Sequence, residues 1–129
     1  MRRVKPIGDR LCEHREMEIR RYTRQDRSVP FQQWLDQLDK LAAAKISKAL
    51  FRMADGNLSR VKWFAGIGEY VIDWGPGYRI YLAKEGLMTI LLLGGGTKKH
   101  QQIDITRAKL LHEEFKSRKK AGDGGILWS

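Results

Sequence analysis

Residues 61–96 constrain the fold more than any other part of the sequence, because they predict consecutive β-strands joined by short turns. Residues 73–77 contain two glycines and a proline, which are the residues that a sharp chain reversal needs. Residues 84–86 form a second, shorter turn signal. The segments between these turns are rich in aromatic and branched apolar residues, as β-strands are. The stretch therefore predicts three strands.

The last of these strands is apolar on both faces. Ile90 is followed by three leucines, so we expect this strand to be the buried, central one. Three glycines then precede a short basic run, and we expect Gly94, Gly95 and Gly96 to let the chain leave the sheet there. Gly66 and Gly68 are interpreted as a bend or bulge inside the first strand.

The turn at residues 73–77 also predicts how the flanking strands pair. If Trp74 and Tyr78 flank the turn, Ile72 lies opposite Ile80 and Tyr70 opposite Leu82, which makes one apolar face. The other face then pairs Asp73 with Arg79 and Val71 with Tyr81. We therefore expect Arg79 and Tyr81 to lie on the face turned away from the helical hairpin, with Tyr81 exposed.

Helical periodicity appears before and after this stretch. Phe31, Trp34, Leu35, Leu38 and Leu41 form one apolar stripe, and a stripe of shifted phase runs from Ile46 to Ala54, which favours two helices in a hairpin. A third stripe follows Asp104, the expected N-cap, and runs through Phe115 to about Lys119 or Lys120.

The predicted fold class is α+β, with a small, mainly antiparallel sheet of about four strands. An N-terminal helical hairpin packs on one face of the sheet, the other face is free, and a helix closes the chain. Residues 1–16 are interpreted as a loose N-terminal extension, residues 17–120 as a single domain and residues 121–129 as a tail. Trp128 in the tail either docks on the domain or stays free.

The charge of the chain favours a polyanionic partner. The formal net charge is +10, and the acidic and basic residues balance within the central strands, so the excess lies outside them. Nucleic acid is the usual partner of so basic a domain, although a solvated surface or an acidic protein partner would also explain it. The sequence contains no apolar stretch long enough for a membrane span. No apolar region follows the basic N-terminus, so we expect no secretory signal. With a single cysteine, Cys12, we expect a cytoplasmic protein without an internal disulfide.

No cofactor is predicted. His14, His100 and His112 are far apart and none stands in a recognised metal-ligand spacing. The glycines before Lys98 lack the spacing of a phosphate-binding loop.

The best candidate residues for chemistry lie at one end of the predicted sheet. Arg79 on a rigid strand could bind a phosphate, or could simply pair with Asp73 across the strands. Lys98, Lys99 and His100 could be a solvated loop or a phosphate-binding cluster, in which His100 is the group that exchanges a proton near neutral pH.

Together, several of these segments resemble the RelE/ParE superfamily of toxins, in particular its HigB-like branch of addiction module killer proteins. The resemblance covers residues 17–119. It is carried by the motifs FQQWL (31–35), GN (56–57), VK (61–62), GPGYRIY (75–81), LLLGGGTKK (91–99) and DITRAK (104–109). It implies a RelE-like fold, in which a helical hairpin packs on a small sheet.

The resemblance also implies a function. It implies the toxin of a type II toxin–antitoxin module, bound by a cognate antitoxin that usually carries a helix-turn-helix domain. Such toxins cut mRNA on the ribosome without a metal ion, by attack of the ribose 2′-OH on the adjacent phosphate. The matching positions imply Arg79, Lys98 and His100 as catalytic residues, and Lys62, Lys99 and Tyr81 as RNA-binding residues.

Two other functions fit the same resemblance. One is a gyrase inhibitor of the ParE type, which shares the fold without the RNase chemistry. The other is a degenerate toxin that only binds its antitoxin, because a shared fold does not establish a shared activity.

Overall fold

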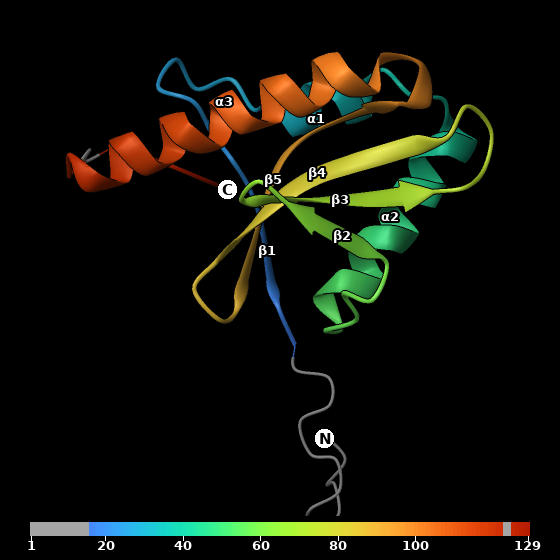
Figure 1. Ribbon diagram of the computed structural model, residues 1–129, viewed down its shortest axis with the longest axis horizontal. Helices are drawn as coiled ribbons and strands as arrows, with labels where there is room; N and C mark the ends of the chain where they lie inside the picture. Colours follow the sequence, from blue (N-terminus) through green and yellow to red (C-terminus); the bar gives the residue numbers. More distant parts are fainter. Residues whose placement is uncertain (1–15, 123–124) are drawn as a thin grey trace, which may run out of the picture.

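The computed structural model describes residues 16–122 and 125–129, and it shows a five-stranded mixed sheet with helices on both faces (Figure 1). The predicted N-terminal extension therefore lies almost wholly outside the described residues. The elements in chain order are β1 (Glu18–Arg21), α1 (Pro30–Asp36), α2 (Lys40–Ala54), β2 (Val61–Phe64), β3 (Ile67–Ile72), β4 (Tyr78–Glu85), β5 (Thr89–Thr97), a 3-10 turn η1 (Lys98–His100) and α3 (Gln101–Lys120).

The sheet has the strand order β1-β5-β4-β3-β2, so the α+β class is confirmed but the expected count of about four strands is too low. Residues 61–72 form two strands instead of one. Ala65 and Gly66 both have positive φ, 49° and 84°, and Phe64 pairs with Ile67 across them. Two residues with positive φ make a tight hairpin turn, so the predicted bend is a complete reversal.

The neighbours of β5 also differ from the prediction. Ile90 and the three leucines after it are fully buried, as predicted. However, β4 is the central strand, and β5 lies between β4 and the short parallel strand β1. The apolar run is buried because helices cover both of its faces.

The helical hairpin packs on one face of the sheet, as predicted. Phe31 of α1, together with Ile46 and Met53 of α2, joins Tyr70 and Ile80 of the sheet in one buried cluster. The second helix begins after Asp39, whose side chain accepts a hydrogen bond from the Ala42 N–H at 2.8 Å. This cap separates the two helices where the apolar stripe changes phase.

The opposite face of the sheet is not free. Helix α3 lies across it, and Leu111 and Phe115 pack there with Tyr22, Tyr81 and Leu91 in a second buried cluster (Figure 1). The prediction of an open sheet face is therefore wrong. The apolar stripe of α3 is buried against this face of the sheet.

The strands β3 and β4 pair two residues away from the predicted register. Ile72 lies opposite Tyr78, Val71 opposite Arg79 and Tyr70 opposite Ile80. Because side chains alternate with a period of two, this shift leaves every side chain on its predicted face. It does change the neighbours, so Arg79 has no cross-strand partner at position 73.

The tail docks on the domain, which decides between the two alternatives for Trp128. Trp128 forms an isolated bridge with Tyr22, and its ring stacks on that of Phe115 with centroids 6.0 Å apart. The Ser129 N–H donates to the Arg21 carbonyl at 3.0 Å. The end of the chain thus covers the outer edge of β1.

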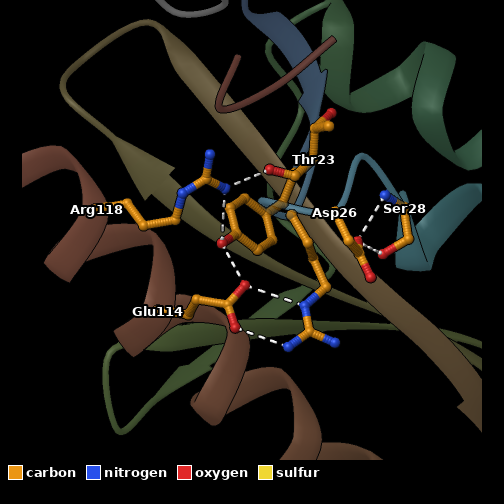
Figure 2. Close-up of polar contacts among 7 residues, drawn as sticks. Thr23, Asp26, Ser28, Glu114 and Arg118 are labelled. Carbon is orange, nitrogen blue, oxygen red and sulfur yellow. Dashed lines mark hydrogen bonds and ion pairs between the residues drawn. The ribbon is translucent and has the colours of Figure 1, made fainter. Parts of the chain in front are cut away.

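A polar network joins the segment that follows β1 to α3 (Figure 2). The Tyr22 hydroxyl donates to Glu114 Oε2 at 2.5 Å, and Arg24 donates twice to the same carboxylate, at 3.1 and 2.8 Å. Arg118 donates to the Tyr22 hydroxyl oxygen at 3.2 Å and to the Thr23 carbonyl at 2.7 Å. The Arg24 guanidinium is the main reason that the pKa of Glu114 lies below its usual value, although partial burial opposes this.

The lowered pKa of Glu114 predicts a loss of stability in acid. Its contribution is complete above the ordinary pKa of a glutamate, about 4.3, and is lost as the pH falls through the lower pKa of the folded state. We expect Glu114→Gln to lower the free energy of unfolding at pH 7 by about 1 kcal/mol, because the ion pair is partly solvated. Denaturant unfolding of both proteins between pH 7 and pH 3 checks this.

The neighbouring Glu113→Gln is the matched control. Glu113 is exposed on the same helix, and among residues 16–122 and 125–129 its ion-pair partner is Lys116, one turn away. We expect its stability to follow the wild type at every pH. If the free energies of unfolding of the wild type and Glu114→Gln differ by the same amount at every pH down to 3, the ionised Glu114 carboxylate is not the source of the stability.

Candidate functional site

Arg79 is held rigidly on β4 with little of its side chain exposed. Its Nη1 donates to the Gly77 carbonyl at 2.8 Å, and its Nε lies 3.4 Å from Glu69 Oε2. The residue is 9% exposed. An arginine held in this way presents its guanidinium with little loss of side-chain entropy when an anion binds.

Glu69 of β3 anchors this part of the structure and was not among the predicted site residues. Its carboxylate is 2% exposed, and Oε2 accepts hydrogen bonds from the Tyr81 hydroxyl at 2.9 Å and from Gln101 Nε2 at 2.7 Å. Burying a carboxylate is costly unless it is paired and hydrogen-bonded, and Arg79 completes that set. A single carboxylate within the apolar strand IGEYVI was the signal that sequence reasoning could have used.

The turn between β3 and β4 brings Lys98 next to Arg79. Gly77 has a φ of +75°, and a Cβ at this position would lie 3.1 Å from Arg79 Nη1 and 3.4 Å from Lys98 Cβ. The Lys98 N–H donates to the Pro76 carbonyl at 3.3 Å. Figure 1 shows the turn and the start of α3 at the same end of the molecule. Arg79 Nη1 and Lys98 Cβ thus lie on either hand of one glycine, whereas the functional assignment of Arg79 and residues 98–100 stays a prediction.

The other two members of the basic run are exposed on η1. His100 lines a hollow of 400 Å³ with Trp34 of α1 and with Asp104 and Arg107 of α3. Arg79 is not among the residues that line this hollow. The structure thus brings Lys98 to Arg79 and places His100 at a neighbouring hollow.

Asp104 is a titratable group of this hollow that the sequence analysis assigned only as a helix cap. Helix α3 begins at Gln101, so Asp104 lies within its first turn and the N-cap prediction is wrong. Burial raises the pKa of Asp104, and the nearby charges of Arg107 and His100 lower it in part. Its neutral form is therefore favoured more than that of an exposed aspartate.

The glycines of β5 have a different role from the predicted one. The chain does not leave the sheet at Gly94, because β5 continues to Thr97 and Gly96 pairs with Arg79. A Cβ at Gly96 would lie 1.9 Å from Asp104 Oδ2, and a Cβ at Gly95 would lie 2.3 Å from a Trp34 ring atom. The missing side chains thus let α1 and α3 approach the strand from its two faces.

The two predicted RNA-binding residues on the strands differ in exposure. Tyr81 is 1% exposed beneath α3, so the prediction of an exposed Tyr81 is wrong. Burial, followed by the Glu69 carboxylate, raises the pKa of Tyr81 above its usual value. Lys62 is exposed on the edge strand β2, where it pairs in register with Glu69. It therefore lies on the same sheet face as the Glu69 carboxylate.

Two further structural findings concern the described part of the chain. Residues 16–122 and 125–129 contain no group of three or more His, Cys, Asp or Glu side chains that could hold a metal ion. Within the same residues, no helix has the length and apolarity needed to cross a membrane.

Comparison with known proteins relates the chain to an uncharacterized protein of Haemophilus influenzae. The two are 42% identical over 90 residues, which cover 68% of this chain and 91% of the Haemophilus protein. The chain belongs to the same family as that protein. No family model matches the sequence. No solved structure matches it either.

Proposed function

We propose that this chain is the toxin of a type II toxin–antitoxin module and cleaves mRNA on the ribosome. The observation that carries the proposal is that Arg79 Nη1 and Lys98 Cβ both lie close to Gly77, at the beginning of the central strand β4. These are two of the residues that the resemblance to HigB-like toxins implies as catalytic. Two cations that reach the same phosphate can stabilise the charge that develops on it during cleavage.

The proposed reaction needs no cofactor. The ribose 2′-oxygen loses its proton and forms a bond to the adjacent phosphorus, and the bond from phosphorus to the 5′-oxygen breaks as that oxygen takes up a proton. Arg79 and Lys98 would stabilise the added negative charge. His100, two residues after Lys98, would exchange a proton with the reacting RNA, and the exposed Lys62 and Lys99 would contact RNA phosphates. The buried Tyr81 would act by holding Glu69, and through it Arg79.

The proposal includes a protein partner in the cytoplasm, namely a cognate antitoxin with a helix-turn-helix domain. Exposed apolar side chains on α3 support a protein partner. Ile103 and Leu110 are 59% and 65% exposed and lie two turns apart on the helix. Residues seven positions apart lie on the same face of a helix, so one partner could cover both.

Induced expression followed by mapping of RNA 5′ ends tests this function. We expect growth arrest and new 5′ ends inside translated reading frames, which disappear when translation is blocked before induction. Induced DNA damage without new RNA ends would instead assign the chain as a gyrase inhibitor. Harmless expression of a folded protein would leave only a binding role.

A further inference from the structure

A second group of cations surrounds a hollow on the side of the sheet that carries the helical hairpin. Lys45, Lys48 and Arg52 of α2 line it together with Arg60, which lies just before β2. The hollow measures 340 Å³. The three α2 residues are spaced three and four positions apart, so they share one face of the helix. Below, this hollow is called the α2 basic pocket.

The described residues offset only a small part of the positive charge of the α2 basic pocket. Asp73 is the only carboxylate among its lining residues. Within residues 16–122 and 125–129, none of the four cations has a carboxylate at ion-pair distance. Lys45 Nζ instead lies 5.0 Å from the centre of the Trp74 ring. A cation–π contact positions the ammonium without cancelling its charge, which leaves it available to an anion.

The α2 basic pocket and the candidate site lie on the same turn of the chain. Trp74 lines the pocket and stacks on Tyr78, with ring centroids 6.1 Å apart. Three residues after Trp74, Gly77 contacts Arg79 and Lys98. Figure 1 shows this turn between α2 and the start of α3. A chain of phosphates that crosses the turn could therefore meet both groups of cations.

We propose that the α2 basic pocket binds phosphate groups of an RNA backbone, as a second RNA contact outside the candidate site. Four cations around one hollow match a polymer that carries a charge on every nucleotide. Contacts of this kind position the RNA and carry little sequence information. The proposal concerns binding alone, and it stands whether or not the chain cleaves RNA.

The test is a salt-dependent binding measurement with an RNA that cannot be cleaved. The probe is a labelled, single-stranded 2′-O-methyl RNA, which lacks the attacking hydroxyl. The variant is the triple substitution Lys48→Gln, Arg52→Gln and Arg60→Gln. We expect its affinity to fall by about tenfold or more, and the slope of log K against log salt to decrease in magnitude by roughly 2, because each lost phosphate contact on a single strand contributes about 0.7.

The matched control removes the same charge elsewhere. Lys84, Lys109 and Lys120 are exposed and line neither the α2 basic pocket nor the hollow at His100. The triple change to Gln at these positions should leave the slope nearly unchanged. Equal losses in both triple variants would overturn the proposal, since they would report net charge only. The proposal is also overturned if the triple variant of the α2 basic pocket keeps the wild-type melting temperature and binds the RNA probe with unchanged affinity. Polyglutamate and unlabelled RNA are also compared as competitors at equal concentrations of negative charge. If polyglutamate displaces the RNA probe as well as RNA does, the pocket is assigned to an acidic protein and the RNA proposal is overturned.

Discussion

Arg79→Ala is expected to lower the rate of RNA cleavage by about 10²–10³-fold, the usual cost of removing one donor that stabilises charge in a transition state. The guanidinium is held by the Gly77 carbonyl and by the Glu69 carboxylate. Its loss therefore removes a preorganised charge that water does not replace. The measurement is the rate at which defined mRNA fragments appear in a translation reaction with purified protein. Lys98→Ala, on an exposed side chain, should cost about tenfold, or 1.4 kcal/mol.

The burial of Glu69 makes a stability control necessary. Arg79→Ala leaves this carboxylate buried without its cation, which costs about 3–5 kcal/mol for a buried pair. The double variant Arg79→Gln with Glu69→Gln removes both charges, and Glu69→Gln alone keeps the arginine. We expect the double variant to melt near the wild type and to be inactive, whereas Glu69→Gln, which keeps the arginine and its hydrogen bond to Gly77, retains part of the activity. A double variant that is folded and fully active would show that Arg79 has no catalytic role.

Gly95→Ala is expected to lower the free energy of unfolding by about 2 kcal/mol, within the range for overpacked cores. A Cβ at this position would lie 2.3 to 2.5 Å from three atoms of the Trp34 ring. The ring is rigid and packs against the cluster that contains Phe31, so it cannot move aside without disturbing α1. The melting temperature should fall by roughly 8 °C, as judged from the size of the domain.

Gly94→Ala is the matched control for this prediction. Gly94 is the preceding residue of the same strand, and a Cβ there meets no atom within 4 Å. Both changes lose the same backbone freedom, so the difference between them isolates the contact with Trp34. In the background Trp34→Ala the cost of Gly95→Ala should largely disappear. Equal effects of the two alanines in the wild-type background would contradict this account of Gly95.

Local patterns predicted much of the fold. Apolar residues at helical spacing marked α1, α2 and α3, and the alternation around the turn at residues 73–77 placed Arg79 and Tyr81 on the correct face. These signals succeed because they depend on residues close together in the chain. The sequence predicted one strand too few for a local reason as well, because the chain reversal at Ala65 and Gly66 was interpreted as a bend within one strand.

Other features depend on contacts between distant parts of the chain. A shift of two residues between β3 and β4 keeps the alternation intact, so the sequence pattern could not exclude it. The sequence showed that α3 has an apolar stripe and did not show which surface would bury it. The packing of α3 on the sheet covers Tyr81 and brings Gln101 to Glu69. Local periodicity could not reveal the polar contacts of Glu69, because its partners Tyr81 and Gln101 lie 12 and 32 residues away in the sequence.

The sequence by itself determined the α+β class, the helical hairpin, the face on which Arg79 lies and the exposed basic run at residues 98–100. Only the tertiary structure decided that α3 covers that face, that Glu69 holds Arg79, and that Gly77 brings Lys98 beside it. The physical reason is the range of the interactions. Periodicity and turn chemistry act over a few residues, whereas the partners of a buried charge are selected by the packing of the whole chain.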